Sequence, residues 1–149
     1  MSHDKIIFEI SEIDKLLNDV ASLLLLCKER NPDLIETMAS AAVLHSFYNG
    51  LENIFLHIAR DYDKTIPSGN KWHKKLLEQM NTENNRKAVL SEEKIQQLSE
   101  YLIFRHFFRH AYSYRLDWDE MKELVLNIET VWAGVKIEIL DFLKKSEKD

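Results

Sequence analysis

Apolar residues recur along this chain at alternating steps of four and three positions. Such a stripe is typical of a helix that buries one face against a core. The stripe near the N-terminus comprises Ile6, Ile10, Ile13, Leu17, Val20, Leu24 and Cys27. The stripe near the C-terminus comprises Met121, Leu124, Ile128, Val131, Val135, Ile139 and Phe142. Only three glycines and two prolines are present, too few for a turn-rich all-β fold. The pattern therefore predicts long helices near both ends.

Capping residues divide the chain into further helices. Proline favours the first helical position, so Asn31-Pro32 predicts one start, and Ser91 predicts another as a preferred cap. Asp117-x-x-Glu120 resembles a capping box. We expect helices over residues 6–27, 31 to about 62, 70–80, 91 to about 114, and from 117 to the charged tail at 144. The predicted fold is all-α: an antiparallel four-helix bundle with a short extra helix, forming a single domain over residues 1–149.

Composition limits the possible partners and the compartment. The formal net charge is −5, so nucleic-acid contact requires a local basic patch. Cys27 is the only cysteine, which excludes an intrachain disulfide and fits a reducing compartment. The longest wholly apolar run, Leu23 to Cys27, is far shorter than a membrane span of ~20 residues, and the first residues show no signal-peptide pattern. We expect a cytoplasmic protein without membrane association.

The fourth predicted helix is apolar on more than one side. One stripe contains Leu98, Tyr101, Phe104 and Phe108, and another contains Ile103, Phe107 and Tyr114. A helix that is apolar all round is buried in a core or against a partner. Because a bundle of this size rarely buries one helix completely, we expect part of this surface to form a homodimer interface.

The same helix concentrates arginine, histidine and aromatic residues in the run Phe104-Arg105-His106-Phe107-Phe108-Arg109-His110-Ala111-Tyr112. Arginine binds phosphate oxygens as a rigid fork, and histidine moves protons near neutral pH. On a regular helix, Arg105 and His110 lie about 140° apart, and Tyr112 lies about two turns beyond Arg105 on the same face. The run suggests chemistry on a phosphodiester. The alternative is a solvated polar edge of a bundle helix.

His106 and His110 stand four positions apart and allow two interpretations. Histidines at this spacing can bind one metal ion, but no glutamate or cysteine stands at helical spacing beside them. The pair is also compatible with acid–base work. The sequence therefore predicts no complete metal site.

Polar residues interrupt an apolar stripe of the second predicted helix. His45, Tyr48 and Glu52 occupy its centre, where apolar residues are expected. A buried carboxylate is costly unless it is paired, so Glu52 is expected to meet Arg105 or Arg109. Alternatively this face is half exposed, and the core stripe is Val43, Phe47, Leu51, Ile54 and Ile58. Both hold if the helix buries a wide arc.

Basic side chains crowd the short helix and the end of the fourth. A local positive zone of this kind suits an RNA backbone, although charge runs are usually solvated faces. The candidate RNA-binding residues are Lys71, His73, Lys74 and Arg115, together with Arg105 and Arg109.

These residues resemble the HEPN family, and specifically its HepT-like toxins. The signature Arg-x4-His-x-Tyr corresponds to the run from Arg105 to Tyr112, with His106 in the position that is usually polar. The second-helix segment Tyr48-Asn49-Gly50-Leu51-Glu52-Asn53 and the middle segments Gly69-Asn70-Lys71-Trp72-His73 and Leu76-Leu77-Glu78-Gln79-Met80 are also similar to that family.

The resemblance implies an all-α homodimer that joins two Arg–His motifs in one cleft and cleaves RNA without a metal or other cofactor. His110 would be the general base or acid, and Arg105 would stabilise the phosphate charge. His106, Arg109, Glu52 and Tyr48 would support them. It also implies a partner, a minimal nucleotidyltransferase antitoxin, which would silence the toxin by transferring AMP to Tyr112.

Two other functions remain open from the sequence. The chain could be a non-catalytic module that binds nucleotide or the nucleotidyltransferase, as some relatives do. It could also be a purely structural dimeric bundle.

Overall fold

Helices make up nearly all of the described chain. The computed structural model describes residues 2–83, 86–110, 112 and 115–147. No strand occurs in these residues, which confirms the predicted all-α class. The elements are α1 (Ser2–Asp19), α2 (Ala21–Glu29), α3 (Leu34–Ile58), the π-helix η1 (Ala59–Asp63), α4 (Trp72–Gln79), α5 (Glu92–His110) and α6 (Trp118–Ser146).

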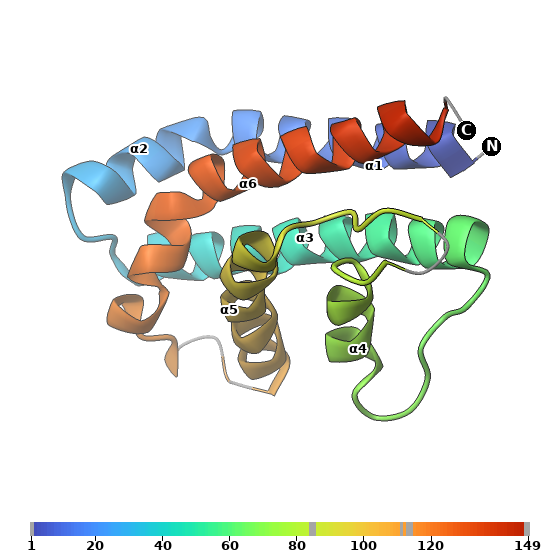
Figure 1. Ribbon diagram of the computed structural model, residues 1–149. Coiled ribbons are helices and arrows are strands. Elements are labelled where there is room, and N and C mark those ends of the chain that lie inside the picture. Colours follow the sequence, from blue (N-terminus) through green and yellow to red (C-terminus); the bar gives the residue numbers. More distant parts are fainter. Residues whose placement is uncertain (1, 84–85, 111, 113–114, 148–149) are drawn as a thin grey trace.

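The helix α3 is the central element of the bundle. It packs against α1, α2, α4, α5 and α6. Figure 1 shows α1, α3 and α6 side by side, with α1 running opposite to α3, and α6 running in the same direction as α3. The helices α4 and α5 lie on the side of α3 away from α1, and α5 crosses α3 steeply rather than lying along it (Figure 1). His3 Nδ1 lies 3.2 Å from Glu147 Oε1, and this contact joins the beginning of α1 to the end of α6.

The N-terminal apolar stripe is buried as predicted, but it does not lie on one continuous helix. On this stripe Val20 is partly buried, and the other six residues are buried: Ile6, Ile10, Ile13, Leu17, Leu24 and Cys27. The helix breaks at Val20, which has φ −104° and ψ 14°. The helical hydrogen bonds of Val20 remain: Val20 N donates to Leu16 O at 3.1 Å, and Val20 O accepts from Leu24 N at 3.0 Å. The break therefore changes the direction of the helix axis between α1 and α2, while the apolar stripe continues to face the core.

The start of α3 differs from the prediction. Asp33, not Asn31, is the N-cap: its side chain accepts a hydrogen bond from Glu36 N at 2.8 Å, and the Glu36 side chain accepts one from Asp33 N at 2.9 Å. Arg30 also binds both carboxylate oxygens of Glu36. This reciprocal capping box places the first turn after Pro32 rather than on it.

Most of both stripes predicted for α3 is buried. Phe47, Leu51, Ile54 and Ile58 are fully buried. The polar-interrupted stripe was predicted to run from Leu34 and Met38 to Ala59. It is buried at Ala41, Tyr48, Phe55 and Ala59, but Leu34 and Met38 at its start are exposed. The ring of Phe47 meets Tyr101 of α5 at 5.3 Å and Trp132 of α6 at 6.2 Å, both edge to face. The wide buried arc of α3 therefore brings its polar residues inside the bundle.

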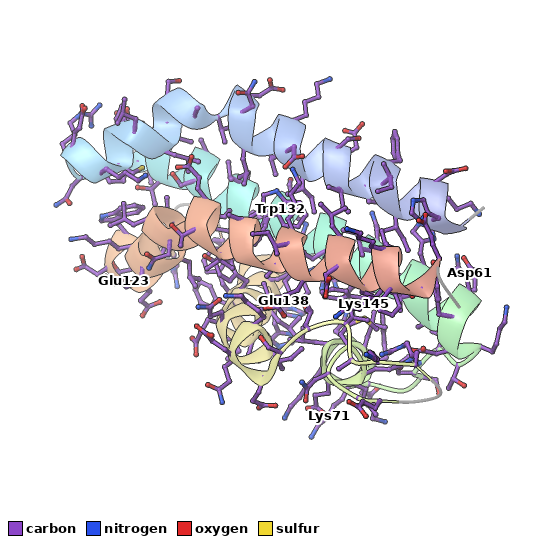
Figure 2. All side chains as sticks on the ribbon, turned by 45° about the horizontal axis from the view of Figure 1, so that its top comes forward. Asp61, Lys71, Glu123, Trp132, Glu138 and Lys145 are labelled. Atoms are coloured by element: carbon purple, nitrogen blue, oxygen red, sulfur yellow. The ribbon has the colours of Figure 1, made fainter. Side chains whose placement is uncertain are left out.

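The C-terminal helix closes the bundle against α1. Trp132 of α6, near the centre of Figure 2, donates to Asp14 at 2.8 Å, and Lys136 pairs with the other oxygen of Asp14 at 2.7 Å. Asp117 caps α6 as predicted, but its side chain accepts from Asp119 N and not from Glu120. Among the described residues, no helix combines the length and the apolar character needed to cross a bilayer.

The helix α5 presents one stripe to the core and another to the surface. It begins after Ser91, whose hydroxyl accepts from Lys94 N at 3.4 Å, as the sequence predicted. Leu98, Tyr101 and Phe104 are buried, whereas Ile103 and Phe107 are exposed.

The predicted extension of this helix beyond His110 is wrong. Tyr112 lies outside any helix, because its carbonyl accepts from Arg115 N at 2.9 Å in the turn towards α6. Tyr114, the expected end of the helix and of its outer stripe, lies outside the described residues.

Candidate functional site

Arg105 is held on the inner side of α5 by α3. Its Nε donates to Asn49 Oδ1 at 2.8 Å, and its Nη2 lies 3.7 Å from Glu52 Oε1. The side chain is only 11% exposed. A guanidinium has five N–H donors, and within the described chain only Nε–H is hydrogen-bonded. Asn49 therefore orients the guanidinium, whose Nη groups make no hydrogen bond within the part of the chain that the structure describes.

Glu52 joins three helices. It is 5% exposed, and its Oε2 lies 2.7 Å from His73 Nδ1 of α4. Its other oxygen faces Arg105 of α5, so the predicted contact with that cation is confirmed. No ion pair connects Glu52 with Arg109 among the described residues. Because the carboxylate is almost completely removed from water, His73 and Arg105 are the groups that offset its cost of desolvation.

The hydrogen bonds of Asn49 determine the tautomer of His45. Arginine only donates, so the amide oxygen of Asn49 faces Arg105 and its nitrogen faces His45 Nε2, 3.1 Å away. His45 Nε2 must then be unprotonated, and Nδ1 carries the proton. Burial lowers the pKa of His45, and the charges of Arg105 and Arg109 lower it further. The hydrogen-bonded chain from Arg105 through Asn49 therefore ends at a neutral His45 imidazole.

Two buried polar groups beside the Arg105–Asn49–His45 chain have no hydrogen-bond partner within the described residues. Tyr48 is completely buried, and neither its hydroxyl nor His45 Nδ1 has a hydrogen-bond partner within the described chain. Burial raises the pKa of Tyr48, the negative charge of Glu52 raises it further, and Arg105 opposes them. The Tyr48 phenol is thus a neutral group beside the Arg105–Glu52 pair.

The two histidines of the motif lie on the outer side of α5. Both His106 and His110 are exposed, and their ring centroids are 4.8 Å apart, edge to face. Within the described residues, no hydrogen bond or ion pair joins His110 to Arg105. No group of three or more histidine, cysteine, aspartate or glutamate side chains in these residues is placed to hold a metal ion. The motif therefore splits into an inward arginine and an outward imidazole pair.

Tyr112 and Arg115 lie together in the turn after α5. Tyr112 is 69% exposed, and the Arg115 guanidinium lies 5.9 Å from its ring centroid. The expectation that Tyr112 follows Arg105 along one helical face is wrong, because α5 ends at His110 and Tyr112 lies outside the helix. Tyr112 is instead displayed on a surface turn.

The predicted basic patch separates into two kinds of residue. Lys71 is exposed at the N-cap of α4, Lys74 is exposed on α4, and Arg109 is exposed on α5. Figure 2 shows Lys71 at the edge of the molecule away from α1. His73 is different: it packs on Trp72, with ring centroids 3.7 Å apart, and bonds Glu52. The lysines are available to a polyanion, whereas His73 belongs to the internal network.

Sequence reasoning missed the partners of Arg105 other than Glu52. His45, Asn49 and Glu52 are spaced by four and three on α3, so they share one face with the predicted site. That spacing was the available signal. No spacing in the sequence indicates that His73 of α4 bonds Glu52, because this contact depends on how α4 packs against α3.

Comparison with protein families identifies a family for this chain. A family model described as "HepT-like protein" matches residues 39–146, which include all of α4, α5 and α6 and most of α3. Comparison with curated proteins finds no match, and comparison with solved structures finds none either. The family match covers more than half of the chain and contains every residue of the Arg105 network. The chain therefore belongs to the HepT-like family.

Proposed function

We propose that this protein is a metal-independent endoribonuclease and the toxin of a toxin–antitoxin pair. The observation that carries the proposal is Arg105: a nearly buried guanidinium fixed through Nε, whose Nη groups make no hydrogen bond to the described residues. Two parallel donors of this kind match two oxygens of a phosphodiester. Membership of the HepT-like family supports this chemistry. The place of action is the cytoplasm.

The proposed reaction is an attack of a ribose 2′-hydroxyl on the adjacent phosphorus. The 2′-oxygen bonds to phosphorus as the bond from phosphorus to the 5′-oxygen breaks. His110 takes the proton of the attacking hydroxyl or supplies one to the leaving oxygen, a contribution of roughly 10²–10⁴-fold. Arg105 binds the extra negative charge on the phosphorane oxygens. The products are a 2′,3′-cyclic phosphate and a 5′-hydroxyl.

We propose that a homodimer completes the site. Arg105 faces inward and His110 faces outward on α5, so one protomer does not pair them directly. Ile103 and Phe107 expose apolar surface on the same helix. Joining two α5 helices through this surface supplies both an acid and a base to one cleft. His106 and Arg109 then line the cleft, and Lys71, Lys74 and Arg115 contact the RNA backbone.

The proposed antitoxin is a minimal nucleotidyltransferase that modifies Tyr112. The phenol oxygen attacks the α-phosphorus of ATP, pyrophosphate leaves, and the phenol proton passes to solvent. The 69% exposure of Tyr112 supports access by a second protein. The attached AMP carries a phosphodiester charge that competes with RNA for nearby cationic side chains. Co-expression followed by peptide mass spectrometry tests this. AMP on another residue, or full neutralisation of Tyr112→Phe, removes Tyr112 from the mechanism.

The ribonuclease itself is tested by incubating the purified protein with total RNA in EDTA. We expect cleavage by the parent and none by His110→Ala. Loss of cleavage in EDTA that one metal restores would instead make His106 and His110 metal ligands.

The exposed position of His110, unconnected to Arg105 within the described residues, favours a second candidate. Arg105 would then bind a nucleotide phosphate in a non-catalytic module. RNA or nucleotide binding without cleavage would identify this function.

A further inference from the structure

We propose that His73 is a positioning residue for Arg105. By bonding Glu52, it holds this carboxylate out of hydrogen-bonding reach of the Arg105 guanidinium, so that the Nη donors stay available to a phosphate. The inference rests on the proposed function in one respect, namely that Arg105 binds phosphate. It adds a residue that the Arg-x4-His-x-Tyr signature does not contain.

The two contacts of Glu52 are unequal. His73 Nδ1 lies 2.7 Å from one oxygen, and Arg105 Nη2 lies 3.7 Å from the other. The first is a short hydrogen bond, and the second is beyond hydrogen-bonding distance. A carboxylate with so little access to water requires a donor. The His73 imidazole is that donor. The Arg105 guanidinium can therefore remain 3.7 Å from the Glu52 carboxylate.

Removing His73 would change the partner of Glu52. Arg105 is the nearest cation, and a short rotation closes the 3.7 Å gap into an arginine–carboxylate pair. Such a pair occupies the Nη donors that two phosphate oxygens would otherwise use. Asn49 continues to hold Nε, so the guanidinium turns towards Glu52 rather than leaving the site.

The docking of α4 does not depend on His73. Leu76, Leu77 and Met80 are fully buried on the same segment. Gln79 near its end donates to Asp63 at 2.7 Å, and Arg86 also binds Asp63. His73 stands in the first turn of α4, a quarter exposed, and packs its ring on Trp72. A ring without the N–H group therefore fits the same place.

The test compares His73→Phe, which keeps an aromatic ring, with His73→Asn, whose amide replaces Nδ1–H. The matched control is His57→Phe, another half-buried histidine of the bundle. We expect His73→Phe to raise the KM for RNA roughly 10-fold, with a smaller change in kcat, because charge-assisted bonds to phosphate are lost. His73→Asn should restore most of the affinity, and His57→Phe should leave it unchanged. If His73→Phe does not fold, His73→Leu takes its place.

A second measurement separates this proposal from the proposed function. NMR of the Arg105 guanidinium, assigned with Arg105→Lys, reports its bonding whether or not the protein cleaves RNA. We expect slower exchange of the Nη hydrogens with water in His73→Phe, and parent-like exchange in His73→Asn. Unchanged exchange in His73→Phe would overturn the proposal.

A double-mutant cycle tests whether His73 acts through Glu52. In a Glu52→Gln background, the carboxylate that competes for Arg105 is gone, so His73→Phe should have no further effect on inorganic phosphate binding or on guanidinium exchange. An equal loss in both backgrounds would show that His73 acts independently of Glu52 and would contradict the assignment.

Discussion

At the scale of single residues, Arg105 shows what the sequence can and cannot predict. Its contact with Glu52 was predictable, because a carboxylate on a buried stripe needs a cation. Its bond to Asn49 was not, since it depends on how steeply α5 crosses α3. The same holds for His73, which reaches Glu52 only because α4 docks beside α5. Residue types thus indicate the candidate site residues, whereas the packing of α4 and α5 on α3 determines which of them are in contact.

Arg105 and His110 should differ in their effect on stability. Arg105→Ala leaves the Asn49 oxygen without its donor and leaves the Glu52 carboxylate with His73 but without a cation, so we expect a loss of about 1–3 kcal/mol in the free energy of unfolding. His110→Ala removes an exposed ring and should change stability by less than about 0.5 kcal/mol. Both should abolish RNA cleavage. Urea unfolding measures the first effect, and equal stabilities would contradict the buried position of Arg105.

His45 should make the fold sensitive to acid. Its pKa in the folded protein is lowered, so the unfolded chain binds more protons as the pH falls below about 6.5. Stability is therefore lost as the pH falls through that value, and protonated His45 can no longer accept from Asn49. His45→Gln keeps an acceptor without titrating, so it should lose less stability than the parent between about pH 7.5 and 5.5. An identical loss in both proteins would refute this linkage.

At the scale of helices, periodicity predicted more than capping did. The stripes of α1–α2, α3 and α6 are largely buried as expected, with Leu34 and Met38 at the start of α3 as exposed exceptions. The errors lie at helix ends: the break at Val20, the start of α3 at Leu34, and the end of α5 at His110. Burial of a stripe is enforced by many residues, whereas an end is decided by one or two local hydrogen bonds.

Two helix-interior glycines offer a matched test of helix packing. A Cβ at Gly50 of α3 would lie 2.8 Å from Ile13 Cγ1 in the buried α1 interface. A Cβ at Gly134 of α6 would lie equally close only to the flexible end of Lys94. We expect Gly134→Ala to stabilise by about 0.5–1 kcal/mol through helix propensity. Gly50→Ala should destabilise by about 1–2 kcal/mol through overpacking. Thermal unfolding compares them, and a stabilising Gly50→Ala would contradict the close α1–α3 contact.

At the scale of the whole molecule, exposed apolar side chains are the feature that the bundle leaves unexplained. The sequence predicted an outer stripe on α5, and Ile103 and Phe107 are exposed there. Exposure alone does not identify the dimer interface. Ile137 of α6 is about as exposed as Ile103, although it lies outside the proposed site.

These two isoleucines provide a direct test of the dimer. Ile103 is 63% exposed and Ile137 is 68% exposed, so a charge at either position costs the monomer little. We expect the parent to be a dimer by light scattering at micromolar concentration. Ile103→Asp should yield a folded monomer without ribonuclease activity, and Ile137→Asp should remain an active dimer. A parent that is monomeric, or an active Ile103→Asp monomer, would contradict the composite site.

The central claim is that Arg105 and His110 cleave RNA through the ribose 2′-hydroxyl without a metal. The most direct measurement is mass spectrometry of the ends formed when the purified protein acts on an RNA oligonucleotide in EDTA, beside DNA of the same sequence. We expect 2′,3′-cyclic phosphate or 3′-phosphate ends with 5′-hydroxyls from RNA, no cut in DNA, and no product from His110→Ala. Cleaved DNA, 5′-phosphate ends, or undiminished cleavage by His110→Ala would contradict it.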